Sequence, residues 1–190
     1  MSPLAVDCVI KVGGGVLARA DTFDAVMAEI SLASREAALL VPGGGPFADT
    51  VRNVDRQVGL SDDAAHWMAI LAMDQYAHLI ASRLPSGEVV CGPDEIESAL
   101  NRRRTPVLAP YQWLRDVDPL PHSWDVTSDS IAAWVAGQVG AERLVLVKPA
   151  GASGLAVVDP CFSSVLSPHI KAAIVTADRI EVLRTVAAGL

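Results

Sequence analysis

Short apolar runs alternate along this chain with longer segments in which apolar residues recur every three or four positions. The short runs are rich in branched residues and apolar on both faces, which is typical of strands in a parallel sheet buried between two helix layers. They predict strands over residues 5–12, 37–41, 88–91, 106–109, 143–147 and 172–176.

The longer segments have the period of amphipathic helices, and Phe23, Val26, Met27 and Ile30 follow this period in the first of them. Further helices are predicted over residues 61–84, 94–103, 127–139 and 177–188. The alternation of strands and helices predicts an α/β fold, a three-layer αβα sandwich with a mostly parallel sheet. We expect a single domain over residues 1–190.

Composition narrows the class of protein. The chain has 190 residues, 51% of them hydrophobic, which is enough for a substantial core. Its net charge of −7 argues against a nucleic-acid partner or a membrane surface, since both favour a basic face. No apolar run approaches the roughly 18 residues that span a bilayer, and the start lacks the pattern of an export signal. Three widely spaced cysteines, Cys8, Cys91 and Cys161, favour reduced thiols, so we expect a cytoplasmic protein.

Three consecutive glycines occur twice, each time directly after a predicted strand. The triplets are Gly13, Gly14 and Gly15, and Gly43, Gly44 and Gly45. Where a strand ends and a helix follows, backbone N–H groups and the positive end of the helix can surround an anion. Tight turns also need glycine, but two such loops on neighbouring strands predict a pair of phosphate-binding loops. Each triplet also fits the loose dinucleotide motif G-x-G-x-x-A, whereas no G-x-x-x-x-G-K-[ST] sequence occurs.

Lys11 lies two residues before the first triplet, near the end of an otherwise apolar strand. Such a lysine must either extend to solvent or pair within a site. Directed at the glycine loop, its ammonium would stabilise charge on a transferred phosphoryl group. No set of His, Cys and carboxylate residues has the spacing of a zinc site, so we assign no metal ligands.

The helix predicted from residue 127 starts with an unusual number of polar residues. Asp125 or Thr127 explains its cap, and Asp129 suits its first turn. Asp125 and Asp129 are four residues apart, so they can share one face and hold a lysine or orient a nucleotide.

The ordered set K-x-G-G-G, P-G-G-G and T-S-D-S before "LVLVKP" is similar to the amino acid kinase family. Within it, "LSDDAAHWMAILAMDQYAHLIA" and "PLPHSWDVTSDSIAAW" resemble a branch that phosphorylates an aminomethylfuran phosphate in methanofuran biosynthesis. The resemblance implies the amino acid kinase fold, with an acceptor-side half over about residues 1–140 and a shortened nucleotide-side half over about 141–190.

The resemblance also implies roles for individual residues. Lys11 neutralises the transferred phosphoryl group, and Asp129 positions the catalytic lysines. The first glycine triplet lies beneath the nucleotide phosphates, and the second faces the acceptor. Lys148 and Lys171 are the other lysines of the chain; we favour Lys148 as the second catalytic lysine because it ends a strand.

Polar residues near these motifs are candidates for acceptor binding. Arg52 is the candidate for the acceptor phosphate, although a surface arginine explains it equally well. Asp49, Asp62 and Asp63 suit a cationic amine, although capping explains the last two as well.

Two further candidates precede the helix at residue 127. His122 is placed either to meet the acceptor or to anchor its loop. Asp125 falls where relatives often have a polar residue on the substrate side.

These features predict an ATP-dependent kinase that uses Mg²⁺ and transfers the γ-phosphoryl group to a phosphate monoester. An acceptor phosphate is already ionised near pH 7, so positioning and charge neutralisation suffice. The alternative is a non-catalytic nucleotide- or oxoanion-binding protein of the same fold. It is favoured by Lys148-Pro149-Ala150, where many relatives have T-D-x-D-G-V. The resemblance further implies a homo-oligomer.

Overall fold

The central element of the protein is one parallel sheet, seen in a computed structural model that describes residues 6–33, 37–152 and 157–189. The order of its six strands is β3-β4-β2-β1-β5-β6. The strands are β1 (Cys8–Val12), β2 (Ala38–Pro42), β3 (Gly87–Val90), β4 (Thr105–Leu108), β5 (Arg143–Lys148) and β6 (Lys171–Thr176). All six predicted strands are confirmed, with ends shifted by a few residues; the first residue predicted for β1 lies outside the described part of the chain.

Helices connect these strands. They are η1 (Gly14–Ala18), α1 (Ala20–Ala33), α2 (Gly45–Val58), α3 (Asp62–Arg83), α4 (Pro93–Asn101), α5 (Tyr111–Val117), α6 (Ser128–Val139), α7 (Phe162–Val165), η3 (Ala177–Val182) and α8 (Leu183–Ala188). The single helix predicted over 177–188 is wrong in detail, because residues 177–182 form a 3₁₀ segment that is itself kinked at Arg179, and the α-helix begins only at Leu183. The first glycine triplet likewise leads into a 3₁₀ turn rather than directly into an α-helix.

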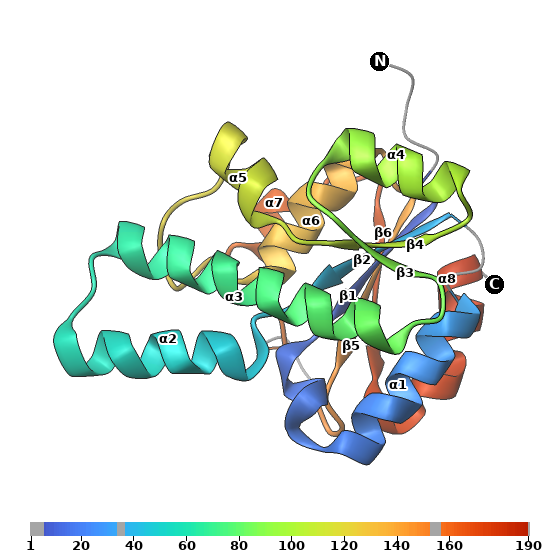
Figure 1. The fold of residues 1–190 in the computed structure, drawn as a ribbon, viewed down its shortest axis with the longest axis horizontal. Helices are drawn as coiled ribbons and strands as arrows, with labels where there is room; N and C mark the ends of the chain where they lie inside the picture. Colours follow the sequence, from blue (N-terminus) through green and yellow to red (C-terminus); the bar gives the residue numbers. More distant parts are fainter. Residues whose placement is uncertain (1–5, 34–36, 153–156, 190) are drawn as a thin grey trace.

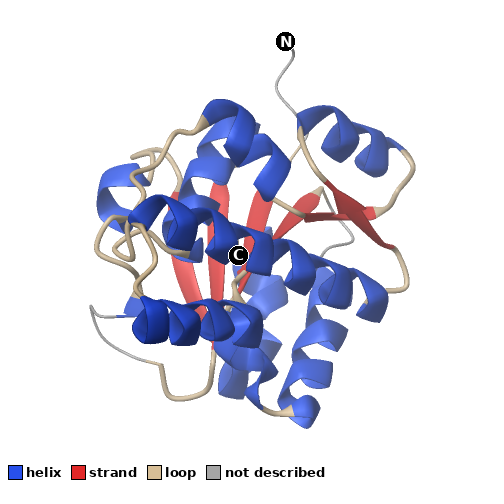
Figure 2. Cartoon of the chain, turned by 60° about the vertical axis from the view of Figure 1, so that its left-hand side comes forward, coloured by secondary structure: helices blue, strands red, loops and turns tan. Residues whose placement is uncertain are grey.

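Helices cover both faces of the sheet, as the sandwich prediction requires (Figures 1 and 2). One core is built from α6 and its neighbours with every second residue of the central strands, and the other from α1 and α8 with the alternate residues. In β1, for example, Val9 faces α6 whereas Ile10 and Val12 face α1. The helix pair α2 and α3 lies side by side and projects from one end of the sheet (Figure 1).

The chain order of the strands creates a crevice next to β1. The chain passes from β1 to β2 on one side, and it later reaches β5 on the other side. In open parallel sheets, ligands bind at the carboxyl ends of the strands where the strand order reverses in this way. Both predicted glycine loops follow strands at this edge.

Cys8, Cys91 and Cys161 are all free thiols. Within the described ranges, no helix is both long and apolar enough to cross a membrane.

Candidate phosphate-binding site

Two lysine side chains reach the same crevice from adjacent strands. Lys11 on β1 follows Val9 on the α6 face, since successive strand residues alternate between faces. On β5, Leu146 pairs with Lys11, and Lys148 lies two residues further on, so it emerges on the same face. Both residues are buried, with 4% and 8% of their surfaces exposed.

A single carboxylate bridges the two lysines. Asp129 lies in the first turn of α6, where the side chain of Thr127 caps the helix by accepting a hydrogen bond from the Asp129 N–H. Its Oδ1 lies 2.8 Å from Nζ of Lys11, and its Oδ2 accepts a 2.5 Å hydrogen bond from Nζ of Lys148. The three side chains therefore form one buried ionic cluster.

Burial and charge oppose each other in this cluster. Burial lowers the pKa of Lys11 below its ordinary value; the negative charge of Asp129 acts against that shift, and the positive charge of Lys148 adds to it. Burial also disfavours the carboxylate of Asp129, but the two lysines outweigh it and hold its pKa below the usual range. Two cations share one anion, and such an arrangement is suited to binding a further negative group.

The two glycine loops touch each other through their backbones. A Cβ atom on Gly14 would lie 2.4 Å from the backbone nitrogen of Gly45, and one on Gly43 would lie 2.8 Å from the nitrogen of Gly14. Gly45 also has a φ of +55°, a conformation that favours glycine. Glycine is therefore needed at these positions because the backbones of the two loops are in contact, and this contact brings the two loops together at the carboxyl ends of β1 and β2.

A cavity of about 240 Å³ opens at this junction. Both lysines, Asp129 and glycines of both loops contribute to its walls. The amino end of α2 at Gly44 also faces it, and no side chain among the described residues caps that end. Backbone N–H groups at a helix start that lack such a cap can bind an anion, although Pro46 contributes none.

The far end of the cavity is formed by α2, α3 and the segment before α6. Arg52 and Asp49 on α2 line it and form a 3.0 Å ion pair. The Arg52 guanidinium also lies over the ring of Trp124, 4.9 Å from its centroid. Trp124 donates a 2.9 Å hydrogen bond through Nε1 to Asp55, which fixes the indole against α2.

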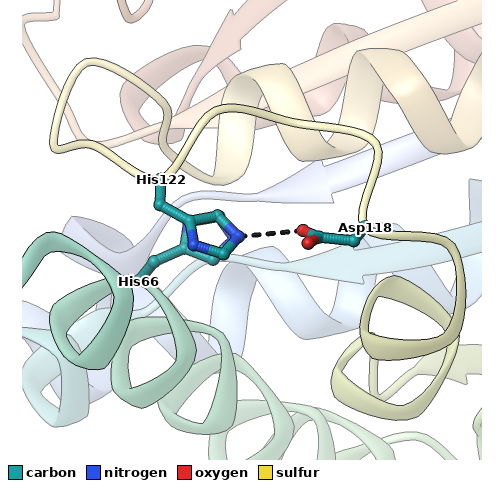
Figure 3. Close-up of side chains that lie close together, drawn as sticks. All are labelled: His66, Asp118 and His122. Atoms are coloured by element: carbon teal, nitrogen blue, oxygen red, sulfur yellow. Dashed lines mark hydrogen bonds and ion pairs between the residues drawn. The ribbon is translucent and has the colours of Figure 1, made fainter.

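Next to this end, His122 anchors its loop to α3. Its Nδ1 lies 2.8 Å from Asp63, and its Nε2 lies 2.8 Å from Asp118. His66 of α3 stacks on His122, with ring centroids 4.1 Å apart (Figure 3). Burial, helped by the nearby His122, lowers the pKa of His66 to about 4, so His66 is neutral near pH 7.

One nitrogen from each of these histidines and an oxygen of Asp118 lie within 4.8 Å of one another, which raises the question of a metal ion. The two rings are nearly parallel, 18° apart, and stacked face to face. Lone pairs of stacked parallel rings do not converge on one ion at the roughly 2.0–2.1 Å that zinc requires. The arrangement instead fits His122 as a hydrogen-bonding link between two carboxylates.

The structure brings together most of the predicted site residues. Lys11, Asp129, Lys148, Arg52 and Asp49 line the cavity, as do Gly14, Gly15, Gly44 and Gly45. Gly13 and Gly43 attach the loops to the sheet, because their N–H groups donate hydrogen bonds to the carbonyl oxygens of Val147 and Val12, respectively.

Other predicted residues lie differently. Asp125 is exposed and does not share a face with Asp129, because α6 begins only at Ser128; that expectation is wrong. Asp63 pairs with His122 and does not line the cavity, whereas its neighbour Asp62 does. Lys171 is the first residue of β6 and is exposed at the amino ends of the strands, away from the cavity at their carboxyl ends.

The sequence interpretation missed Asp159. This buried carboxylate accepts hydrogen bonds from Thr127 and Ser130 at the start of α6. Nothing in the local pattern around residue 159 indicates this contact, because it spans about 30 residues of chain.

A parallel sheet that gathers two glycine loops, a helix start and a lysine pair around one cavity is typical of α/β proteins that bind ligands at the carboxyl ends of their strands. Residues 8–151 match the model of the Amino acid kinase family, and the chain belongs to that family.

Individual relatives agree with this assignment. The chain is 22% identical over 140 residues to [5-(aminomethyl)furan-3-yl]methyl phosphate kinase of Methanocaldococcus jannaschii, covering 73% of this chain and 63% of that relative's length. Its fold is similar to that of uridylate kinase from Archaeoglobus fulgidus, with a TM-score of 0.72, 17% identity and coverage of 97% and 96% of the two chains. UMP kinase from Ureaplasma parvum gives a TM-score of 0.68 at 15% identity, covering 91% and 90%. These likenesses confirm the predicted fold.

Proposed function

We propose that this protein is an ATP-dependent kinase that transfers the γ-phosphoryl group to a small phosphate monoester. The observation that carries the proposal is the bridge from Asp129 to both Lys11 and Lys148 at the junction of the two glycine loops. Phosphoryl transfer depends mainly on positioning and on neutralising charge on equatorial oxygens, and this cluster supplies both.

In the proposed reaction, an oxygen of the acceptor phosphate forms a bond to the γ-phosphorus as the bond to the ADP oxygen breaks. The products are ADP and a diphosphate. Because the acceptor oxygen is already ionised near pH 7, no side chain has to remove a proton. Lys11 and Lys148 hold the negative charge of the transferred group, and Asp129 fixes their positions.

We assign the loop from β1 to the nucleotide phosphates and the loop from β2 to the acceptor side. The curated relative is named for an aminomethylfuran phosphate, and the far end of the cavity has the matching chemistry. Arg52 would bind the acceptor phosphate, and the carboxylates of Asp49 and Asp62 would bind its ammonium group. His122 and Asp63 would act indirectly, by holding the loop that carries Trp124.

Magnesium fits this proposal as part of the nucleotide substrate. Among the carboxylates lining the cavity, Asp129 is shared by two lysines, Asp49 pairs with Arg52, and Asp62 lies in the first turn of α3. These residues do not form a dedicated cage, and Mg²⁺ commonly binds through substrate phosphates and water. ATP would thus enter as its magnesium complex.

The test is an incubation of the purified protein with ATP, Mg²⁺ and [5-(aminomethyl)furan-3-yl]methyl phosphate, followed by phosphorus NMR. The expected result is ADP together with a new diphosphate. UMP serves as the competing acceptor, because the structural neighbours are uridylate kinases. Formation of UDP alone would overturn the furan assignment and keep the kinase. Nucleotide binding without ADP formation for either acceptor would favour the non-catalytic binding protein.

Three coarser parts of the proposal concern the whole molecule. We infer an acceptor-side half over about residues 1–140 and a nucleotide-side half over about 141–190. We further infer a cytoplasmic location, where ATP is available, and association into a homo-oligomer. Analytical ultracentrifugation of the full chain tests the last of these, and a single monomeric species would contradict it.

A further inference from the structure

Asp159 connects the segment after β5 to the start of α6. Its Oδ2 accepts hydrogen bonds from the Thr127 N–H (2.9 Å), the Thr127 hydroxyl (2.7 Å) and the Ser130 N–H (3.0 Å), and its Oδ1 accepts one from the Ser130 hydroxyl. Ser130 is fully buried and Asp159 is 9% exposed. A carboxylate at a helix start also interacts favourably with the helix dipole.

These hydrogen bonds continue directly to the lysine cluster. The Thr127 hydroxyl donates to Asp159, and its oxygen accepts from the N–H of Asp129 at 3.4 Å. Asp129 lies between the two residues that Asp159 holds, so the carboxylate of Asp159 fixes the turn from which Asp129 reaches Lys11 and Lys148.

Asp159 also changes the charge balance. Lys11, Lys148 and Asp129 together carry one excess positive charge, and Asp159 is the second buried carboxylate beside them. The charged groups that act on Lys11 are Asp129, Lys148 and Asp159, and the charge of Asp159 opposes the lowering of the Lys11 pKa by burial.

We propose that Asp159 is a positioning residue of the phosphate site: it orients Asp129 through the first turn of α6 and supplies the second negative charge for the two lysines. The catalytic part of this inference rests on the proposed kinase function. The charge part does not, so the two can be tested separately.

The chain allows a direct measurement because it contains only three lysines, Lys11, Lys148 and Lys171. Labelling lysine with ¹³C at the ε-carbon gives one signal for each, and each signal shifts as its amine loses a proton. In Asp159→Asn, which keeps the side-chain shape, the Lys11 signal is expected to titrate at a lower pH than in the wild type. The exposed Lys171 is an internal reference, and Asp94→Asn on α4 is the matched control.

Activity provides the second readout. Asp159→Asn is expected to lower kcat on the order of 10- to 100-fold, because a small displacement of Asp129 misplaces both lysines. Asp159→Glu keeps the charge but moves the carboxylate by one methylene. It is expected to lower kcat while the Lys11 titration stays close to that of the wild type.

The outcomes separate the two proposals. An unchanged Lys11 titration in folded Asp159→Asn would overturn the charge role. Unchanged kcat in Asp159→Glu would overturn the positioning role, and this holds even where Asp159→Asn fails to fold. A shifted titration in a protein that transfers no phosphoryl group to either acceptor would instead retain the charge role and reject the kinase.

Discussion

Lys148 ends strand β5 and donates a 2.5 Å hydrogen bond to Asp129 at the start of α6. Lys11 reaches the other oxygen of the same carboxylate. In the sequence, the segment Lys148-Pro149-Ala150 favours a non-catalytic binding protein, whereas Lys148 is also the candidate for the second catalytic lysine. The observed hydrogen bond puts Lys148 beside Lys11, and it leads to the following predictions.

Replacing Lys148 tests whether it acts with Lys11 in the reaction. Lys148→Met keeps much of the side-chain volume but removes one of the two cations. We expect kcat to fall on the order of 10²- to 10³-fold, as when one preorganised partner of the developing charge is lost. Lys171→Met is the matched control, since Lys171 is exposed at the amino end of β6, whereas Lys148 lies at the carboxyl end of β5. Equal activity of the two variants would exclude Lys148 from the mechanism.

Replacing Asp129 tests the electrostatics of the cluster. Asp129→Asn leaves two buried ammonium groups without their shared carboxylate, so the free energy of unfolding at pH 7 is expected to fall by about 3 kcal/mol.

The pH dependence of this loss has a definite sign. Burial lowers the pKa of Lys11 in the folded protein, and losing Asp129 lowers it further, whereas the unfolded lysine keeps a pKa near 10.4. In the Asp129→Asn variant, the unfolded state therefore binds more protons than the folded state. Its free energy of unfolding rises with pH between the folded and the unfolded pKa of Lys11. Urea denaturation is expected to show a smaller difference from the wild type at pH 9 than at pH 7. An equal or larger difference at pH 9 would contradict this explanation.

A substitution in the first glycine loop tests the contact between the loops. In Gly14→Ala the new methyl group would meet the backbone of Gly45, so the loops must separate and the protein should lose both activity and thermal stability. Gly137→Ala is the control, because nothing lies within 4 Å of its added Cβ and alanine favours the helix by about 1 kcal/mol. Calorimetry should therefore give the highest melting temperature for Gly137→Ala, an intermediate one for the wild type and the lowest for Gly14→Ala. A different order would argue against the contact.

Arg52 is the test of the acceptor site. Arg52→Ala removes a charged donor that lines the cavity, and we expect the KM for the phosphate acceptor to rise roughly 10- to 100-fold, the equivalent of about 1.5–3 kcal/mol. The KM for ATP should change little. Arg56→Ala is the control on the same helix, where Arg56 is exposed and bonds to Asn53. A rise in the KM for ATP alone would place Arg52 on the nucleotide side.

The fold was largely predictable because its signals are local. Runs that are apolar on both faces, such as the one at β5, identify buried parallel strands. Ser61 identifies the start of α3, where its side chain accepts a hydrogen bond from the Ala64 N–H. Short elements such as α7, with four residues, have too few turns to show a period.

The site was predictable only where residues are adjacent in sequence or fixed by strand alternation. Lys11 and its loop satisfy the first condition, and Lys148 satisfies the second. The hydrogen bonds of Asp159, and those that hold Trp124 to Asp55, join segments far apart in the chain. Their partners depend on how helices pack on the sheet, which the local pattern does not specify. Asp125 was misplaced because it lies before the helix, which begins at Ser128, so a spacing of four residues does not put it on the same face as Asp129.

The register between β1 and β5 has a consequence for how this chain can change over time. Lys11 and Lys148 stand on neighbouring hydrogen-bonded strands, whose separation of about 4.8 Å is fixed by the backbone. The backbone spacing of the two lysines is thus set by β1 and β5, whereas Asp129 at the start of α6 holds their ammonium groups. Insertions or deletions between β1 and the start of α6 can reshape what the cavity accepts, while the backbones of the two lysines keep their separation.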